Sequence, residues 1–255
     1  MERAQNVISC NMMSYKQYRD GAFAHLSSIG IKHVEISAPE PSKVDEVRKE
    51  LERHDLRVSA VSFGLDLSCE VDEQIRPRIE VAEALDCRLL WVSAHAGELP
   101  KEKAYEKLRR AGDLAGEAGM TIVLETHPDL AHNADVALET LTKVDHPHVR
   151  LNFDTGNIYY YNQGRNAVDE LKKVAHLVRS VHLKDTNGKY RTTCFPALGE
   201  GVVDFAEVFR ILNGVGFFGP FTLEIEGVEG EELTREEVYQ RVEKSLEHLK
   251  SLGVI

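Results

Sequence analysis

Short apolar runs alternate with segments of helical period along the whole chain. Eight of these runs are rich in β-branched and aromatic residues, which predicts strands. The predicted strands are Val7–Met12, His33–Ser37, Arg57–Phe63, Leu89–His95, Thr121–Thr126, Val149–Asp154, Ser180–Lys184 and Phe221–Glu226. Several of them are continuously apolar, as expected for parallel strands that are covered on both faces.

The segments between these runs have the pattern of amphipathic helices. Two apolar stripes at helical spacing are Tyr18-Ala22-Leu26-Ile29 and Val238-Val242-Leu246-Leu249. Thr234 with Glu237, and Asp204 with Glu207, are predicted to be capping pairs at helix starts. The glycines that fall where helices should end are Gly30, Gly119 and Gly216.

Alternating strand and helix units predict parallel strands joined by right-handed crossovers. Eight such units without an intervening linker favour one closed (β/α)8 TIM barrel over residues 1–255, and such barrels have about 250 residues. An open, doubly wound sheet is the alternative. No G-x-G-x-x-G motif follows a predicted strand, which argues against a dinucleotide-binding version of that sheet.

Composition and charge narrow the classes of partner. The formal net charge is −11 and no dense basic run occurs, so we expect no nucleic-acid partner. The first ten residues lack an apolar signal core and no run of 18 apolar residues follows, which predicts a cytoplasmic chain without a membrane span. The four cysteines form no CxxC pair, so we expect reduced thiols.

The last four predicted strands each end with a side chain that commonly binds metals. Glu125, Asp154, His182 and Glu224 lie at these ends, where barrels of this kind carry their active sites. Alone, each is ordinarily a salt-bridge partner or a satisfied boundary residue. Together on neighbouring strands, three carboxylates would repel one another unless a cation bound between them. Three oxygen donors and one imidazole suit Mn²⁺, Mg²⁺ or Co²⁺ better than a structural zinc.

Sequence motifs around these four residues indicate a family. The motifs are IVLETHP (122–128), LNFDTGN (151–157), VHLKD (181–185), LGEGVVDF (198–205) and FTLEIEG (221–227). With them the whole chain resembles the xylose isomerase-like TIM-barrel superfamily. That superfamily includes sugar isomerases, keto-sugar 3-epimerases, inosose dehydratases, dehydroshikimate dehydratases and apurinic endonucleases.

The resemblance implies that the four residues bind one divalent metal ion. Mn²⁺ is the preferred ion, with Mg²⁺, Co²⁺ and Zn²⁺ as alternatives. In the epimerase branch, the residues in the places of Glu125 and Glu224 are also the paired acid and base. That branch has a histidine three residues after the aspartate and an arginine soon after the strand-seven histidine. Here Asn157 replaces that histidine, and Arg191 or Lys184 would replace that arginine. These residues are expected to bind substrate.

In the dehydroshikimate dehydratase branch, a histidine in an ETHP stretch and a lysine in an HLK stretch belong to the active site. His127 and Lys184 match these positions, and the ordinary alternatives are a loop cap and a solvated loop lysine. We expect His127 to act in catalysis and His95, at the end of its strand, to face the substrate. Glu226 and Glu35 are candidates for supporting the metal ligands, although Glu35 could instead pair with a lysine.

These residues predict a metal-dependent isomerase or epimerase of a keto-sugar or polyol-derived ketone, working by α-proton abstraction and an enediolate. The alternative is a dehydratase of a cyclic keto-alcohol such as an inosose or dehydroshikimate. An inactive binding module is a third reading, which the intact ligand set disfavours. The endonuclease branch needs further histidines for a three-metal cluster, and Asn157 and the stretch 193–196 do not supply them. We expect a small sugar or cyclitol as the substrate, and a homo-oligomer is compatible with the sequence.

Overall fold

Eight parallel strands close into a barrel in the order β1-β2-β3-β4-β5-β6-β7-β9 in a computed structural model that describes residues 5–255. Residues 1–4, which the predicted domain includes, lie outside the described part of the chain. The barrel strands are β1 (Ile8–Asn11), β2 (His33–Ser37), β3 (Arg57–Asp66), β4 (Leu89–His95), β5 (Thr121–Glu125), β6 (Val149–Asp154), β7 (Val178–Leu183) and β9 (Phe221–Leu223). The predicted (β/α)8 barrel is confirmed.

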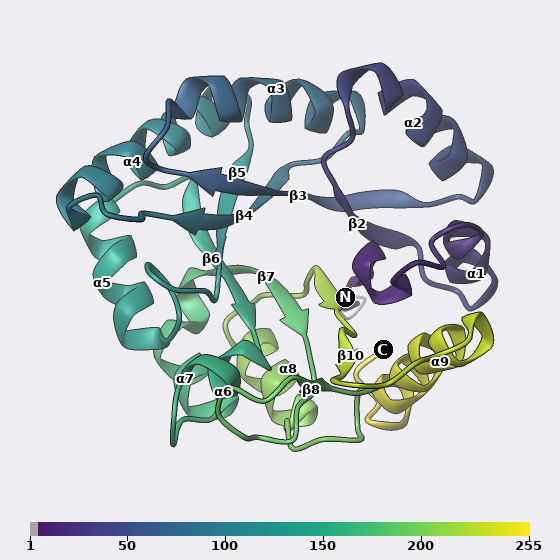
Figure 1. Cartoon of the computed structure of the whole chain (residues 1–255). Coiled ribbons are helices and arrows are strands. Elements are labelled where there is room, and N and C mark those ends of the chain that lie inside the picture. Colours follow the sequence, from purple (N-terminus) through teal and green to yellow (C-terminus); the bar gives the residue numbers. More distant parts are fainter. Residues whose placement is uncertain (1–4) are drawn as a thin grey trace.

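Helices surround the barrel on its outer side (Figure 1). They are η1 (Met12–Tyr15), α1 (Ala22–Ser28), η2 (Pro41–Lys43), α2 (Val44–Arg53), α3 (Val71–Ala84), α4 (Lys101–Glu117), α5 (Ala134–Val144), α6 (Asn157–Tyr161), α7 (Ala167–Val174), η3 (Ala175–Leu177), α8 (Phe205–Gly214) and α9 (Arg235–Ser251). Their buried aliphatic and aromatic side chains form one core with the outer faces of the strands. No helix among residues 5–255 is long and apolar enough to cross a membrane.

The predicted helix boundaries follow from local capping. Thr234 and Glu237 form a complete capping box at the start of α9. Asp204 caps α8 by accepting the Glu207 N–H at 3.0 Å, but the Glu207 side chain turns to an arginine, so the box is only half formed. The three predicted stop glycines have left-handed backbone with φ between 66° and 88°, as helix ends require.

Several strand ends differ from the sequence-based prediction, and those of β7 and β9 concern residues of the predicted site. Strand β7 ends at Leu183 and β9 ends at Leu223, so Lys184, Glu224 and Glu226 lie just beyond the barrel strands. A second, two-stranded sheet follows these strands, in which β10 (Gly227–Val228) pairs antiparallel with β8 (Cys194–Phe195). This sheet joins the segment after β7 to the segment after β9, beyond the carboxyl ends of both strands. The side chains after β7 and β9 therefore lie at the mouth.

The register of the parallel strands aligns the predicted ligands. Asp154 on β6 pairs directly with His182 on β7, and His182 pairs with Thr222, two residues before Glu224. Glu125, the last residue of β5, pairs with Asn152 on β6. Residues that are paired in a parallel sheet face the same side, so these polar side chains form layers inside the barrel at its carboxyl end.

Candidate metal centre

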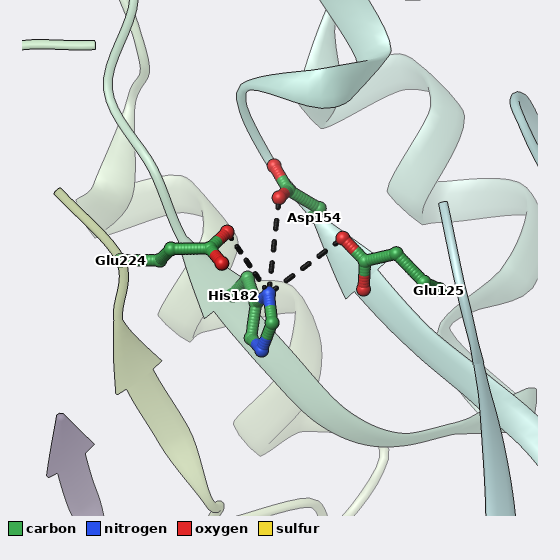
Figure 2. Close-up of side chains that lie close together, drawn as sticks. All are labelled: Glu125, Asp154, His182 and Glu224. Carbon is green, nitrogen blue, oxygen red and sulfur yellow. Dashed lines mark ion pairs between the residues drawn. The ribbon is translucent and has the colours of Figure 1, made fainter. Parts of the chain in front are cut away.

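Glu125, Asp154, His182 and Glu224 converge at the carboxyl end of the barrel. All four are buried, and one ligand atom from each lies within 4.8 Å of the others. The Nδ1 atom of His182 is 3.1 Å from Glu224 Oε2, 3.6 Å from Glu125 Oε1 and 3.9 Å from Asp154 Oδ2. Figure 2 shows the three carboxylates pointing toward this imidazole. Ligands about 2.0–2.6 Å from one ion have this spread, so the cluster could hold a single metal.

Glu125 is held by three N–H donors from other strands and from α6. Its Oε2 atom accepts the indole N–H of Trp91 at 2.7 Å and an amide hydrogen of Asn152. Its Oε1 atom accepts from Asn157 Nδ2 at 3.1 Å. Oε2 is therefore occupied by protein donors, and Oε1 is the oxygen that faces His182. The Trp91 ring also stacks on His182, with ring centroids 5.4 Å apart.

A carboxylate orients His182 through the ring nitrogen that points away from the other three ligands. Its Nε2 lies 3.1 Å from both oxygens of Glu35, which is itself fully buried. Asn11 Nδ2 donates to Glu35 Oε1 at 2.8 Å and approaches Glu224 Oε1 at 3.3 Å. With Glu35 ionised, this arrangement favours a proton on Nε2 and makes Nδ1 the nitrogen that would bind a metal. Glu35 thus contacts one of the four predicted ligands, and no lysine pairs with it among the described residues; its role in supporting a bound metal stays a prediction.

Backbone amides and a serine fix the other two carboxylates. Asp154 Oδ1 accepts the N–H groups of Gly156 and Asn157, both at 2.8 Å, which leaves Oδ2 toward the centre. Ser14 Oγ donates to the Leu223 carbonyl at 3.3 Å and accepts the Ile225 N–H at 3.0 Å. Ser14 thereby holds the backbone on both sides of Glu224.

Lys184 is buried inside the centre, with 2% of its surface exposed. Its Nζ lies 2.7 Å from Glu224 Oε2, 2.9 Å from Asp154 Oδ2 and 2.9 Å from Glu226 Oε1. A Cβ atom on Gly156 would come within 2.7 Å of the Lys184 side chain, so glycine at this position leaves room for it. The alternative of a solvated loop lysine is wrong.

The chemistry of the donor set fits a divalent cation. Asp154 Oδ2, His182 Nδ1 and Glu224 Oε2 are buried and make no well-directed hydrogen bond to any described residue, although the Lys184 ammonium group forms ion pairs with the two carboxylate oxygens. Buried polar atoms without hydrogen bonds are costly, and here the three point at the same place. Three carboxylate oxygens and one imidazole nitrogen suit Mn²⁺, Mg²⁺, Co²⁺ or Zn²⁺.

The electrostatics of the cluster are strongly coupled. Burial, together with the charges of Glu125 and Glu224, raises the pKa of Asp154 well above its ordinary value despite the nearby lysine. Burial also opposes ionisation of Glu224, but His182 and Lys184 outweigh it and hold that pKa well below the usual range. Burial disfavours the charged form of His182, yet the surrounding carboxylates raise its pKa. A metal ion entering the centre must compete with bound protons.

His127 and His95 lie on one side of the mouth and share a hydrogen-bond partner. Ser93 Oγ is 2.8 Å from His127 Nδ1 and 3.1 Å from His95 Nε2. Burial lowers the pKa of His127, which keeps its ring neutral near pH 7. His95 is exposed, and its contact with substrate remains a prediction.

Arg191 is not brought to the metal ligands. It is exposed, its Nε donates to the Tyr190 hydroxyl at 3.0 Å, and no contact with the four ligands occurs in the described chain. Asn157 is buried against Glu125 and Lys184 instead of facing open solvent. The substrate-binding roles expected for both residues therefore remain predictions, with less support for Arg191.

Sequence reasoning missed Trp91, Asn152 and Asn11. Asn152 lies two residues before Asp154, so it faces the same side of its strand one layer deeper. Ser180 precedes His182 by the same interval and donates to Asn152 Oδ1 at 2.6 Å. This two-residue spacing was a usable signal for both. Trp91 and Asn11 do not precede a predicted metal ligand on their own strands, so this spacing does not point to them.

Known proteins resemble this chain over most of its length. It is 26% identical over 243 residues to an inosose dehydratase of Clostridium botulinum (strain Alaska E43 / Type E3), covering 80% of this chain and 81% of that protein. Among solved structures, a D-allulose 3-epimerase from Methylomonas sp. superposes with a TM-score of 0.77 at 21% identity, covering 99% and 100% of the two chains. IOLI protein with a bound zinc atom superposes with a TM-score of 0.75 at 19% identity, covering 96% and 98%.

The structural likenesses, at these low identities, show the fold alone. The family is shown by a sequence model for the xylose isomerase-like TIM barrel, which matches residues 23–252 and so spans most of the chain. It agrees with the resemblance carried by the strand-end motifs and with the closed barrel. The chain belongs to the xylose isomerase-like TIM-barrel family.

Proposed function

We propose that the protein is a divalent-metal-dependent lyase that removes water from a cyclic keto-alcohol, with an inosose as the preferred substrate. The observation that carries this proposal is the Lys184 ammonium group, buried among Glu224, Asp154 and Glu226 beside the metal ligands. Elimination needs an acid near the leaving hydroxyl, and the Lys184 ammonium group beside the metal ligands is our candidate for this acid. The inosose dehydratase relatives support the same reaction class.

An isomerase or epimerase, which the sequence favoured, becomes the second candidate. Proton transfer beside a ketone is common to both reactions, and the epimerase neighbours share the fold. Two substrate-binding positions of the epimerase branch are filled differently here. Asn157 replaces a histidine and is already engaged by Glu125 and Lys184, and Arg191 is exposed on Tyr190.

The residues at the mouth of the barrel have separate roles in the proposed elimination. A bound Mn²⁺, or another of the ions named above, supplies Lewis acidity to the ketone oxygen. His127, whose Nδ1 is engaged by Ser93, takes the proton from the carbon beside the ketone. The carbon–oxygen bond of the β-hydroxyl then breaks, and the ammonium group of Lys184 gives this oxygen a proton, so it leaves as water. Solvent takes the proton from His127 and returns one to Lys184.

The decisive experiment follows exchange and elimination together. Wild-type protein with Mn²⁺ in D₂O is incubated with an inosose, dehydroshikimate or a keto-sugar, and the masses of the products are measured by mass spectrometry. We expect loss of one water from a cyclic keto-alcohol. Lys184→Met and His127→Ala should each lower the elimination rate by about 10²–10⁴-fold, as loss of a general acid or base does.

Lys189, an exposed lysine in the loop after β7, offers the matched control. Lys189→Met should keep the wild-type rate. A product of unchanged mass that carries deuterium, with exchange surviving in Lys184→Met, would replace the lyase with the epimerase. Elemental analysis of the purified protein identifies the bound ion.

A further inference from the structure

Asn157 contacts three different residues of the centre at once. It is the first residue of α6, three positions after Asp154, and only 4% of its surface is exposed. We propose that Asn157 is a positioning residue that holds Glu125, Asp154 and Lys184 in fixed relation, and that it does not bind substrate. The kinetic part of this inference rests on the proposed function, whereas its metal-affinity part does not.

The backbone of Asn157 acts on Asp154. Its N–H donates to Asp154 Oδ1 at 2.8 Å, beside the equivalent bond from Gly156. Two donors on one oxygen fix the rotation of the carboxylate. The other oxygen, Oδ2, is then left toward His182 Nδ1.

The side chain of Asn157 joins groups of opposite charge. Its Nδ2 donates to Glu125 Oε1 at 3.1 Å, and its Oδ1 accepts from Lys184 Nζ at 3.3 Å. The reverse orientation of the amide would set its carbonyl against a carboxylate and its NH₂ against an ammonium group. The two charges therefore fix the direction of the amide, and the amide fixes the distance between the charges.

The restraint falls on the oxygen of Glu125 that faces the metal position. Trp91 and Asn152 already hold Oε2, so Oε1 is positioned by Asn157 alone among the described donors. Asn157→Asp keeps the size of the side chain and an acceptor for Lys184, but it sets a second carboxylate against Glu125. Asn157→Ala removes both side-chain contacts and keeps the backbone bond to Asp154.

A control is available at the other end of the same short helix. Asn162 is buried and its Nδ2 donates to the carbonyls of His132 and Ile158, while its Oδ1 accepts from Asn133. It makes no contact with the centre in the described structure. Asn162→Ala should lower the melting temperature of the protein without altering its metal affinity.

The experiment uses the full chain stripped of metal and titrated with MnCl₂ in a calorimeter, with melting curves for each variant. We expect Asn157→Ala and Asn157→Asp to raise the Kd for Mn²⁺ by about 10–100-fold, the usual loss for residues that orient metal ligands. Asn162→Ala should keep the wild-type Kd. At saturating Mn²⁺, kcat should fall in both Asn157 variants while KM stays at the wild-type value.

Two results would overturn the inference. A raised KM with unchanged Kd for Mn²⁺ would make Asn157 a substrate ligand, and wild-type values of both would leave it without a role. If one variant fails to fold, as its melting curve would show, the other decides. Wild-type protein that binds Mn²⁺ but dehydrates none of the ketones would refute the proposed lyase and leave the affinity comparison intact.

Discussion

Replacing Glu35 by glutamine tests whether the carboxylate behind His182 sets the metal affinity. Glu35 is fully buried, and both of its oxygens lie 3.1 Å from His182 Nε2. It makes no contact with the position where the metal would bind. A change in metal affinity on Glu35→Gln would therefore be transmitted through the imidazole, or through Asn11, which contacts both Glu35 and Glu224.

The size of the effect follows from the change in the acceptor. A hydrogen bond to a charged group contributes about 1.5–3 kcal/mol and a neutral one about 0.5–1.5 kcal/mol, so glutamine should lose about 1–1.5 kcal/mol. Because about 1.4 kcal/mol is a tenfold change in an equilibrium constant, the Kd for Mn²⁺ should rise about tenfold. Burial raises the pKa of Glu35, which shows that the fold disfavours its charge, so the metal-free variant should not lose much stability.

Calorimetric titration of the metal-free protein with Mn²⁺ measures this change. Glu170 is a matched control, because it is also buried but binds the Ala134 N–H and Arg165, with no contact to the four ligands. Glu170→Gln should lower the melting temperature and keep the wild-type Kd. If Glu35→Gln binds Mn²⁺ as tightly as the wild type, the reasoning about His182 is wrong.

Three further predictions concern stability and pH. Mn²⁺ at about 100 times its Kd should stabilise the fold by about 2.7 kcal/mol and raise the melting temperature by about 5–10 °C, and a chelator should reverse this rise. An unchanged melting curve would count against the metal site. Burial lowers the pKa of His127, so this base stays deprotonated below the ordinary histidine value of about 6.5, and kcat/KM should begin to fall only below that pH. A fall in kcat/KM that begins above about pH 6.5 would contradict the role of His127 as the base. A Cβ on Gly112 would contact His146 and lie 2.8 Å from Val149 Cγ2, so Gly112→Ala should lower the free energy of unfolding, measured with denaturant, by about 1–3 kcal/mol. Gly214 has open space around its Cβ position, so Gly214→Ala should not destabilise the protein.

The alternation of apolar runs predicted the barrel and, with it, the level at which the ligands meet. Asp154 ends its strand as expected, Glu125 ends β5 one residue earlier than predicted, and His182 and Glu224 lie within one residue of a strand end. This worked because parallel strands that are buried on both faces are continuously apolar, so an ionisable residue at their end stands out. The family motifs then favoured metal binding by these residues over ordinary salt bridges.

What the sequence could not supply was the partner of each polar group. Glu35 and His182 are 147 residues apart, and only barrel closure brings them into contact. The contact between Lys184 and Glu226 joins residues just beyond β7 and β9, where the chain leaves the barrel and goes on to the β8–β10 sheet. Short segments such as α6 have too few residues for a helical period to be visible.

Trp91 is the only tryptophan in the chain, and it touches two of the four ligands. All of the indole fluorescence of this protein therefore originates at the metal centre. An ion bound by Glu125 and His182 changes the electric field at the ring, so emission should shift as the site fills. A paramagnetic ion such as Mn²⁺ should also quench that emission, whereas Zn²⁺ should not. The protein thus carries an internal optical probe that distinguishes which metal it has taken up.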